Sequence, residues 1–250
     1  MRLREWRWWL AGIIGYLVFL LATFPAVYAV AWLQKHLPDI QLAGVSGSVW
    51  SGAAQDVALK GQSWGALQWH FDWRAPFTGR LGYRLQLHGP DVVLQGKLAA
   101  RNAGKLLLQD IQGQIQISRL EPWLPLPSGS LNGTLQLQLA RVVLTQGRPI
   151  MADGVVNLND LSLNWPQPAT LGSYQLKLQT QVKNDIRGNL LDTSGPLMVQ
   201  GNLNLAPDGR YEISGTLASR DPANTSVNNL LHYLPTDASG SHPFQFNGQW

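Results

Sequence analysis

The stretch Leu67-Gln68-Trp69-His70-Phe71-Asp72-Trp73-Arg74 alternates between apolar and polar side chains. Successive side chains of a β-strand point to opposite faces of the sheet, so this pattern predicts a strand with one buried face. Similar ladders recur at Tyr83–Leu87, Ile111–Ile117, Leu135–Leu139, Tyr174–Leu178 and Leu203–Leu205. Turn sequences separate them, and about eleven strands joined mostly by short turns predict an antiparallel sheet. The chain is therefore expected to be all-β.

Glycine repeatedly occupies the apolar face of these ladders, for example in Ile111-x-Gly113-x-Ile115. Glycine inside a strand usually marks a bend, a bulge or a close approach of another group. We therefore predict a strongly curved sheet, U-shaped or half-open and barrel-like, with an apolar interior. The glycines expected to face inward are Gly96, Gly113, Gly133, Gly154, Gly201, Gly215 and Gly248.

The apolar interior has two interpretations. Opposite walls could pack together, each glycine facing a bulky leucine or tryptophan. Alternatively, the interior could hold acyl chains, which requires an exposed or lidded apolar surface larger than soluble monomers normally show. Sequence alone leaves both open.

Two stretches favour helix over strand. Pro122–Leu126 is long enough for at most one turn. Asp221 and Pro222 precede an apolar stripe ending at Leu234, which is typical of an N-cap, a proline at the first helical position and a short amphipathic helix. We predict one short helix near the C-terminus.

A run of 26 residues from Trp8 to Leu33 carries no charged side chain. It exceeds the roughly 20 residues that cross a bilayer as a helix. Arginines precede it, so the positive-inside rule places the N-terminus in the cytoplasm. We predict a cytoplasmic tail and transmembrane signal anchor at 1–34, and an exported β domain at 35–250. The residues expected at the membrane interfaces are Arg2, Arg4, Arg7, Trp8, Trp9 and Trp32.

The alternative for this run is a cleavable signal peptide, because Ala29-Val30-Ala31 offers small residues at a suitable spacing. Signal peptides usually have an apolar region of only about 7 to 15 residues, which favours a retained anchor. Pro25 lies inside the run and would kink or end a helix there.

Composition excludes several classes of protein. Charged residues make up 14% of the chain, well below the typical quarter, and cysteine is absent. Disulfides and thiolate chemistry are therefore impossible. The net charge of +4 is too small to indicate nucleic acid, and three of the cations flank the membrane run.

The residues that could carry chemistry form no recognisable site. The five histidines have no metal-ligand spacing, and the only glutamates are Glu5, Glu121 and Glu212. Nucleophile elbows, phosphate-binding loops and dinucleotide-binding glycine motifs are absent from the sequence. We expect no enzyme, no catalytic or metal-binding residue and no cofactor.

Trp50, Trp64, Trp69 and Trp73 fall close together in the sequence. Aromatic side chains supply large buried areas, so these residues could belong to the core. Tryptophan is also enriched at protein–protein interfaces, so partner contact stays open.

The order of several segments resembles a known family. A basic tail and one apolar run are followed by Val45-Ser46-Gly47-Ser48-Val49-Trp50-Ser51-Gly52-Ala53, then by Gly65-x-Leu67-x-Trp69-x-Phe71 and Gly79-x-Leu81. Over essentially its full length, the chain resembles protein N of the type II secretion system, the general secretory pathway protein N. The resemblance implies a single-pass inner-membrane protein with its bulk in the periplasm, accessory to the export of folded proteins through an outer-membrane secretin. It implies no catalytic residues.

The resemblance also implies partners, namely other secretion subunits on the inner-membrane platform or the secretin side, together with the phospholipid bilayer. The leading hypothesis is a scaffold or assembly factor, which could dock through a strand edge or the tryptophans. A looser similarity of the ladders to the large envelope proteins of the AsmA and TamB type implies the alternative. That alternative is a periplasmic lipid-binding or lipid-transfer module with an apolar groove and a bound lipid.

Overall fold

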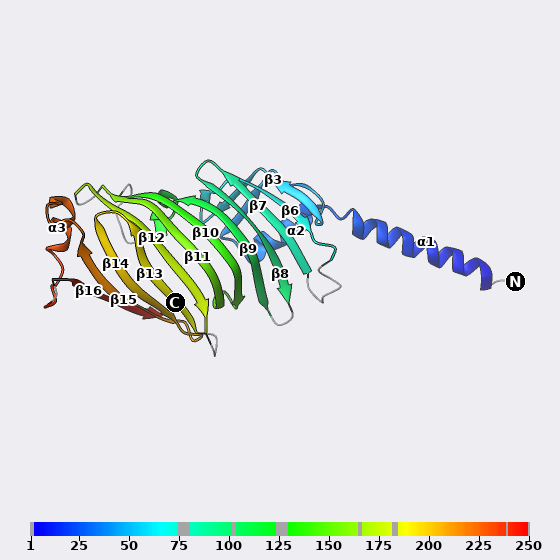
Figure 1. Cartoon of the computed structure of the whole chain (residues 1–250). Helices are drawn as coiled ribbons and strands as arrows, with labels where there is room; N and C mark the ends of the chain where they lie inside the picture. The colour runs from blue at the N-terminus through cyan, green and yellow to red at the C-terminus, as the bar shows by residue number, and fades with distance from the viewer. Residues whose placement is uncertain are drawn as a thin grey trace.

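The computed structural model describes residues 3–74, 81–101, 104–123, 130–164, 167–181, 185–238 and 240–249. Within these residues the chain forms a 13-stranded sheet and a small three-stranded sheet (Figure 1). The order of the large sheet follows the sequence, and each pair of neighbouring strands is antiparallel. The predicted all-β class and the large antiparallel sheet are confirmed.

The large sheet consists of β2 Ser46–Gly47, β3 Ser51–Ala54, β6 Ala66–Phe71, β7 Leu81–Gly89, β8 Val92–Arg101, β9 Lys105–Gln116, β10 Leu131–Thr145, β11 Arg148–Leu163, β12 Ala169–Thr180, β13 Ile186–Ser194, β14 Leu197–Leu205, β15 Arg210–Ser219 and β16 His242–Gln249. The small sheet consists of β1 Ile40–Ala43, β4 Asp56–Leu59 and β5 Gln62–Ser63. The helices are α1 Leu3–Ala22, α2 Ala26–His36 and α3 Thr225–Leu231, and the 3₁₀ turns are η2 Ile117–Arg119 and η3 Glu121–Trp123. The short helix predicted near the C-terminus is confirmed as α3.

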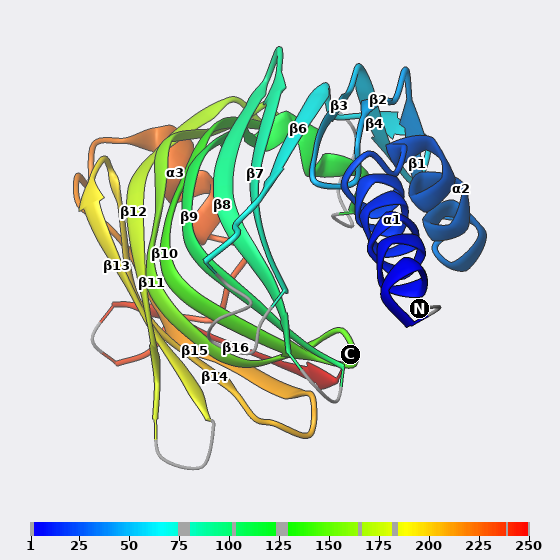
Figure 2. The same ribbon diagram turned by 90° about the vertical axis from the view of Figure 1, so that its right-hand side faces the viewer.

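The large sheet curls without closing on itself. Its end strands are β2 and β16, which do not pair with each other, and Figure 2 shows α3 inside the curve. Leu230 of α3 packs against a buried cluster that contains Leu171 and Val199, so the inner face is the one that carries the leucines. The half-open, curved sheet expected from the glycine pattern is therefore present.

The outer face of the sheet is polar. Gln68, Gln86, Gln95, Gln112 and Gln138 lie opposite one another across strands β6 to β10. Side chains directly opposite in an antiparallel pair lie close enough to interact across the strands, and Gln95 Nε2 donates to Gln112 Oε1 at 3.5 Å. The row explains how a chain with few charges keeps one side of a long sheet in water.

Buried clusters follow one rim of the inner face. Trp64, Val92 and Ile115 form one of them, with Leu120 from the loop after η2 packed against it. Ala169, Leu171, Tyr174 and Val199 form another, covered by α3. Further along the same strands, inner-face leucines are only half-buried; they include Leu98, Leu108, Leu139, Leu178 and Leu203.

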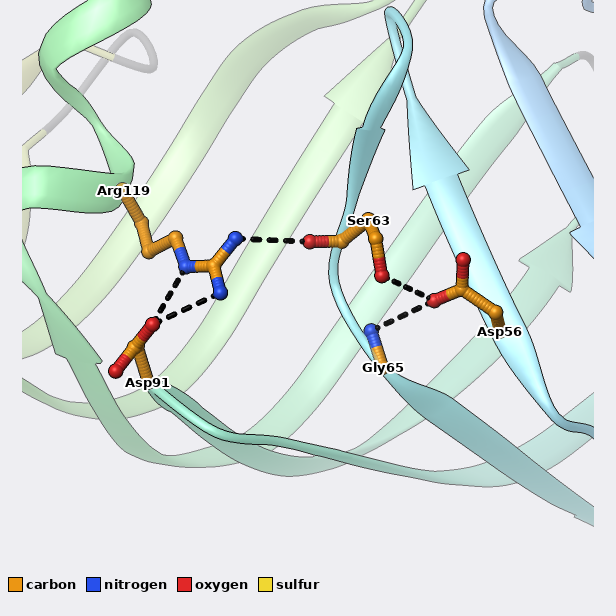
Figure 3. Close-up of polar contacts among 5 residues, drawn as sticks. All are labelled: Asp56, Ser63, Gly65, Asp91 and Arg119. Carbon is orange, nitrogen blue, oxygen red and sulfur yellow. Dashed lines mark hydrogen bonds and ion pairs between the residues drawn. The ribbon is translucent and has the colours of Figure 1, made fainter.

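A polar network fastens the small sheet to the large one (Figure 3). Arg119 of η2 donates from Nε and Nη2 to Asp91 Oδ2, at 2.9 and 2.8 Å, and from Nη1 to the Ser63 carbonyl at 3.1 Å. Asp56 Oδ1 accepts from Ser63 Oγ at 2.5 Å and from the Gly65 amide at 3.1 Å. The network joins β4 and β5 to the turn between β7 and β8.

The uncharged run from Trp8 to Leu33 does not form one continuous helix. Helix α1 ends at Ala22, and α2 begins at Ala26 after Pro25. Proline has no N–H and its ring clashes with the preceding turn, which is the physical reason for the break. In the described residues, no helix has both the length and the apolar character needed to cross a membrane. The structure therefore corrects the prediction that Trp8 to Leu33 form a single long membrane-spanning helix.

Candidate functional site

The most distinctive local structure lies where the N-terminal helices meet the β domain. Ser46 to Ala54 form a tight hairpin, in which β2 pairs with β3 and β3 pairs with β6. The Trp69 indole N–H donates to the Ser48 carbonyl at 3.1 Å and fixes the turn of this hairpin. We call residues Ser46–Gly52 with Trp69 the anchor clamp.

The glycines of the anchor clamp are required by geometry. Gly47 has φ +86°, and a Cβ there would lie 2.6 Å from the Ser51 carbonyl oxygen. A Cβ on Gly52 would lie 2.5 Å from Cζ2 of Trp69. Distances this short are steric clashes, so the first glycine makes the turn possible and the second leaves room for the indole ring.

The clamp holds the chain between α1 and α2. The Trp50 indole N–H donates to the Leu21 carbonyl at 2.7 Å, and the Val49 amide donates to the Phe24 carbonyl at 3.0 Å. In a continuous helix the Leu21 carbonyl would accept from the amide of residue 25, but Pro25 has none. Trp50 therefore satisfies a carbonyl that the proline leaves without its helical partner.

Helix α2 is part of the β domain. Ala26 is 1% exposed and belongs to a buried cluster with Ala54 and Trp69. An isolated bridge between Pro25 and Ser48 adds to this contact. The helix runs to His36, across the boundary at 34/35 that was expected between the anchor and the exported domain. The end of α1 is therefore attached to the sheet without a flexible linker.

The four tryptophans noted in the sequence have different environments. Trp64 and Trp69 are buried, each 8% exposed, in separate clusters. Trp50 and Trp73 pack against each other and against Phe71, with ring centroids 4.8 to 5.1 Å apart. Trp73 is 62% exposed. The structure thus brings Trp50, Trp69 and Trp73 to the clamp region and leaves Trp64 in the core beneath the small sheet.

Helix α1 exposes large apolar side chains along its length. Trp9 is 74% exposed, and Tyr16, Phe19 and Leu21 are each 62% exposed. Trp32, which was expected at a membrane interface, is 63% exposed on α2. Arg2 lies outside the described residues, and the structure does not describe the side chains of Arg4, Arg7 and Trp8. Large exposed apolar surfaces mark sites of interaction with lipid or protein.

The seven glycines predicted to face inward lie close to neighbouring strands of the same sheet. Gly201 and Gly215 are opposite each other, and a Cβ on Gly215 would lie 2.7 Å from the Gly201 Cα. A Cβ on Gly248 would meet the Tyr211 ring, and one on Gly96 would lie 3.3 Å from Ile111 Cγ1. The remaining glycines of the set, Gly113, Gly133 and Gly154, have their nearest neighbours in adjacent segments in the same way.

Two tyrosines of the β domain have a raised pKa. Burial is the main reason that the pKa of Tyr174 is raised to about 12, with a further rise from Asp192 and a decrease from Arg220. Burial also raises the pKa of Tyr83. In the part of the chain that the structure describes, no group of three or more His, Asp or Glu side chains could hold a metal ion.

The contact that Trp50 makes was not predicted from the sequence. Its partner, the Leu21 carbonyl, is 29 positions away in the sequence. The available signal was Pro25, because a proline within a helical run leaves a carbonyl four residues earlier without its usual donor. The Arg119 network was also missed, since its members are distributed over four separate segments.

Comparison with known proteins identifies the family. The family model described as "Type II secretion system (T2SS), protein N" matches residues 38–245. The chain belongs to this family. Among similar proteins, type II secretion system protein N of Aeromonas hydrophila is 29% identical over 247 residues, covering 95% of each chain.

Two further relatives carry the same description. The protein from Klebsiella pneumoniae is 28% identical over 249 residues, covering 94% of this chain and 92% of its own. The protein from Vibrio cholerae is 28% identical over 239 residues, covering 88% of this chain and 89% of its own. No solved structure gives a significant match. The family resemblance, which rested on the order of the apolar run, the Gly-Ser-Val-Trp-Ser-Gly segment and the Trp69 strand, is thus confirmed. In the structure the Gly-Ser-Val-Trp-Ser-Gly segment forms most of the anchor clamp.

Proposed function

We propose that this chain is a non-enzymatic scaffold or assembly factor of the type II secretion system, held at the inner membrane with its β domain in the periplasm. The observation that carries the proposal is the direct attachment of the apolar, exposed helix α1 to the sheet through Trp50. A rigid body joined to a membrane anchor presents its surfaces at a fixed height above the bilayer. That property suits a component that positions other subunits.

The proposed topology follows from the N-terminal charges. The arginines place the N-terminus in the cytoplasm and α1 in the membrane as the single-pass anchor. Because α2 packs against the sheet, the periplasmic domain begins at Ala26 and not at the predicted residue 35. The buried position of Ala26 supports an anchor that is retained. Cleavage after Ala31 would remove Ala26 from the cluster with Ala54 and Trp69 and would cut within α2.

Strand β16 is the edge best suited to a partner. It has eight residues and, within the described part of the chain, pairs with β15 alone. At the other end of the sheet, β2 has two residues, and Ser48 next to it forms a bridge with Pro25. Unpaired edge strands can accept a strand from another protein. Phe246 is 63% exposed on β16 and offers an apolar contact along the edge that has no strand neighbour among the described residues.

Site-specific photocrosslinking of the full chain tests this proposal. A photoreactive amino acid replaces Phe246 on β16, and a matched control carries it at Gln95, which is exposed on β8 in the middle of the sheet. We expect adducts with a secretion subunit at 246 and not at 95. Equal crosslinking at both positions, or adducts with unrelated envelope proteins alone, would refute β16 as the docking edge.

One observation favours lipid binding as a second candidate. The inner face is lined by leucines, and those away from the covered rim, such as Leu98, Leu139 and Leu203, remain half-buried. Apolar side chains on a concave face suit acyl chains. Native mass spectrometry of the chain purified from membranes distinguishes the candidates, since a lipid carrier is expected to retain phospholipid in a fixed stoichiometry.

A further inference from the structure

Aromatic rings gather around the point where α1 leaves the β domain. Phe24 follows α1, and its ring lies 6.0 Å from that of Tyr28 on α2. Trp73 packs on Trp50, which donates to the Leu21 carbonyl at 2.7 Å at the end of α1. Trp32 continues the row along α2, four residues after Tyr28. We call Phe24, Tyr28, Trp32 and Trp73 the aromatic collar.

The collar is exposed although its members are large and apolar. Tyr28 is 67% exposed, Trp32 is 63% exposed and Trp73 is 62% exposed. Val27, beside Tyr28, is 53% exposed. The opposite side of α2 is in contact with the domain, since Ala26 is 1% exposed against Ala54 and Trp69. Helix α2 thus has one face bound to the sheet and one apolar face without a described partner segment.

The short connection between the helices restricts what can cover this face. Only Thr23, Phe24 and Pro25 separate α1 from α2, and three extended residues span at most about 10 Å. Hydrogen bonds from Trp50 and Val49 shorten the reach further. Figure 1 shows α1 projecting away from the sheet while α2 lies against it. If α1 is inserted in a bilayer, the collar must lie at the bilayer surface.

The chemistry of the collar matches that location. Tyrosine and tryptophan have an apolar ring and a polar N–H or O–H, and they are enriched at the headgroup level of membranes. Lys35 and His36 in the last turn of α2 add cationic or polar groups that suit lipid phosphates. Phe24, which is 43% exposed, lies in the sequence between the exposed apolar residues of α1 and those of α2 and packs near Tyr28.

We propose that the aromatic collar rests on the phospholipid bilayer and that α2 is an interfacial helix that seats the β domain on the membrane. This inference rests on the proposed anchoring by α1 and adds the surface of the domain that faces the lipid. The sheet is then held in one orientation relative to the membrane, with β16 at a reproducible position for docking.

Spin-label accessibility in the full chain tests the seating. The chain has no cysteine, so single substitutions Tyr28→Cys, Trp73→Cys and Gly12→Cys give unique labels, with Asn202→Cys on the exposed face of β14 as the control. The protein is reconstituted in vesicles of phosphatidylethanolamine and phosphatidylglycerol. Collisions of each label with oxygen, which enters lipid, and with a water-soluble nickel chelate are then measured.

We expect labels at 28 and 73 to collide several-fold less with nickel than the label at 202, while collisions with oxygen stay high. Low collision rates with both reagents would indicate protein contact and would overturn the inference. Nickel accessibility at 28 and 73 equal to that at 202, with the label at 12 shielded, would refute the seating and leave the anchor intact. Nickel accessibility at 12 as well would refute the anchor itself.

Discussion

The bond between Trp50 and Leu21 gives the most specific prediction for the anchor clamp. The substitution Trp50→Phe keeps an aromatic ring against Phe71 and Trp73 but removes the indole N–H. The Leu21 carbonyl then retains only the Phe24 amide, at 3.4 Å, as a weak donor. A hydrogen bond of this kind contributes about 1 kcal/mol, so the junction should open about five times more often.

Amide hydrogen exchange measures this opening. The Val49 amide donates to the Phe24 carbonyl across the junction, so its exchange rate reports how often the clamp releases α1. In nanodiscs we expect Trp50→Phe to raise that rate about fivefold, whereas Trp73→Phe, which leaves the Leu21 bond intact, should not. The Gly65 amide, bonded to Asp56, serves as an internal control in both variants. Exchange of Val49 within twofold of the unsubstituted chain would refute the role assigned to Trp50.

Other predictions concern the sheet and its attachment. Gly215→Ala should lower the free energy of unfolding by about 1 to 3 kcal/mol in urea titrations, because its Cβ would clash with Gly201, whereas Gly96→Ala should have a smaller effect. Arg119→Gln should lower the free energy of unfolding by about 1 kcal/mol and speed amide exchange in β4 and β5. Lys97→Gln, which breaks an exposed ion pair with Asp110, should change the free energy of unfolding by less than about 0.5 kcal/mol. The pKa of Tyr174 is about 12 in the folded chain, above its ordinary value of 10.0. The protonated Tyr174 hydroxyl therefore contributes fully to the free energy of unfolding below pH 10, and this contribution is lost as the pH rises towards 12. Stability should fall by up to about 3 kcal/mol over that range, and Tyr174→Phe should remove this part of the pH dependence.

Period-two alternation was sufficient to predict the large sheet, because one face is apolar throughout and the other carries amides. The small sheet was not predictable, since β5 has two residues and β1 and β4 have four each, too few to show a period. Pro25 indicated from the sequence that a helix could break there. The packing of α2 against Ala54 and Trp69 was not predictable, because it depends on contacts between segments that are distant in the sequence.

The start of α3 shows a similar limit at short range. Asp221 was the expected N-cap, but the helix is capped by Asn224, whose side chain accepts from the Val227 amide at 3.1 Å. Asp221 instead accepts from the Ala223 amide at 2.9 Å and forms the preceding turn. Asp and Asn both favour caps and turns, so composition alone does not separate the two roles.

Cysteine labelling in intact cells tests the central claim, a periplasmic β domain held at the inner membrane by α1. Single cysteines replace Asn202 on β14 and Leu3 at the start of α1 in the otherwise cysteine-free chain. A membrane-impermeant maleimide should label position 202 in spheroplasts and position 3 only after lysis, and the protein should stay with the membranes after carbonate extraction. Labelling of position 3 from outside, protection of position 202, or release of the chain by carbonate would contradict the account.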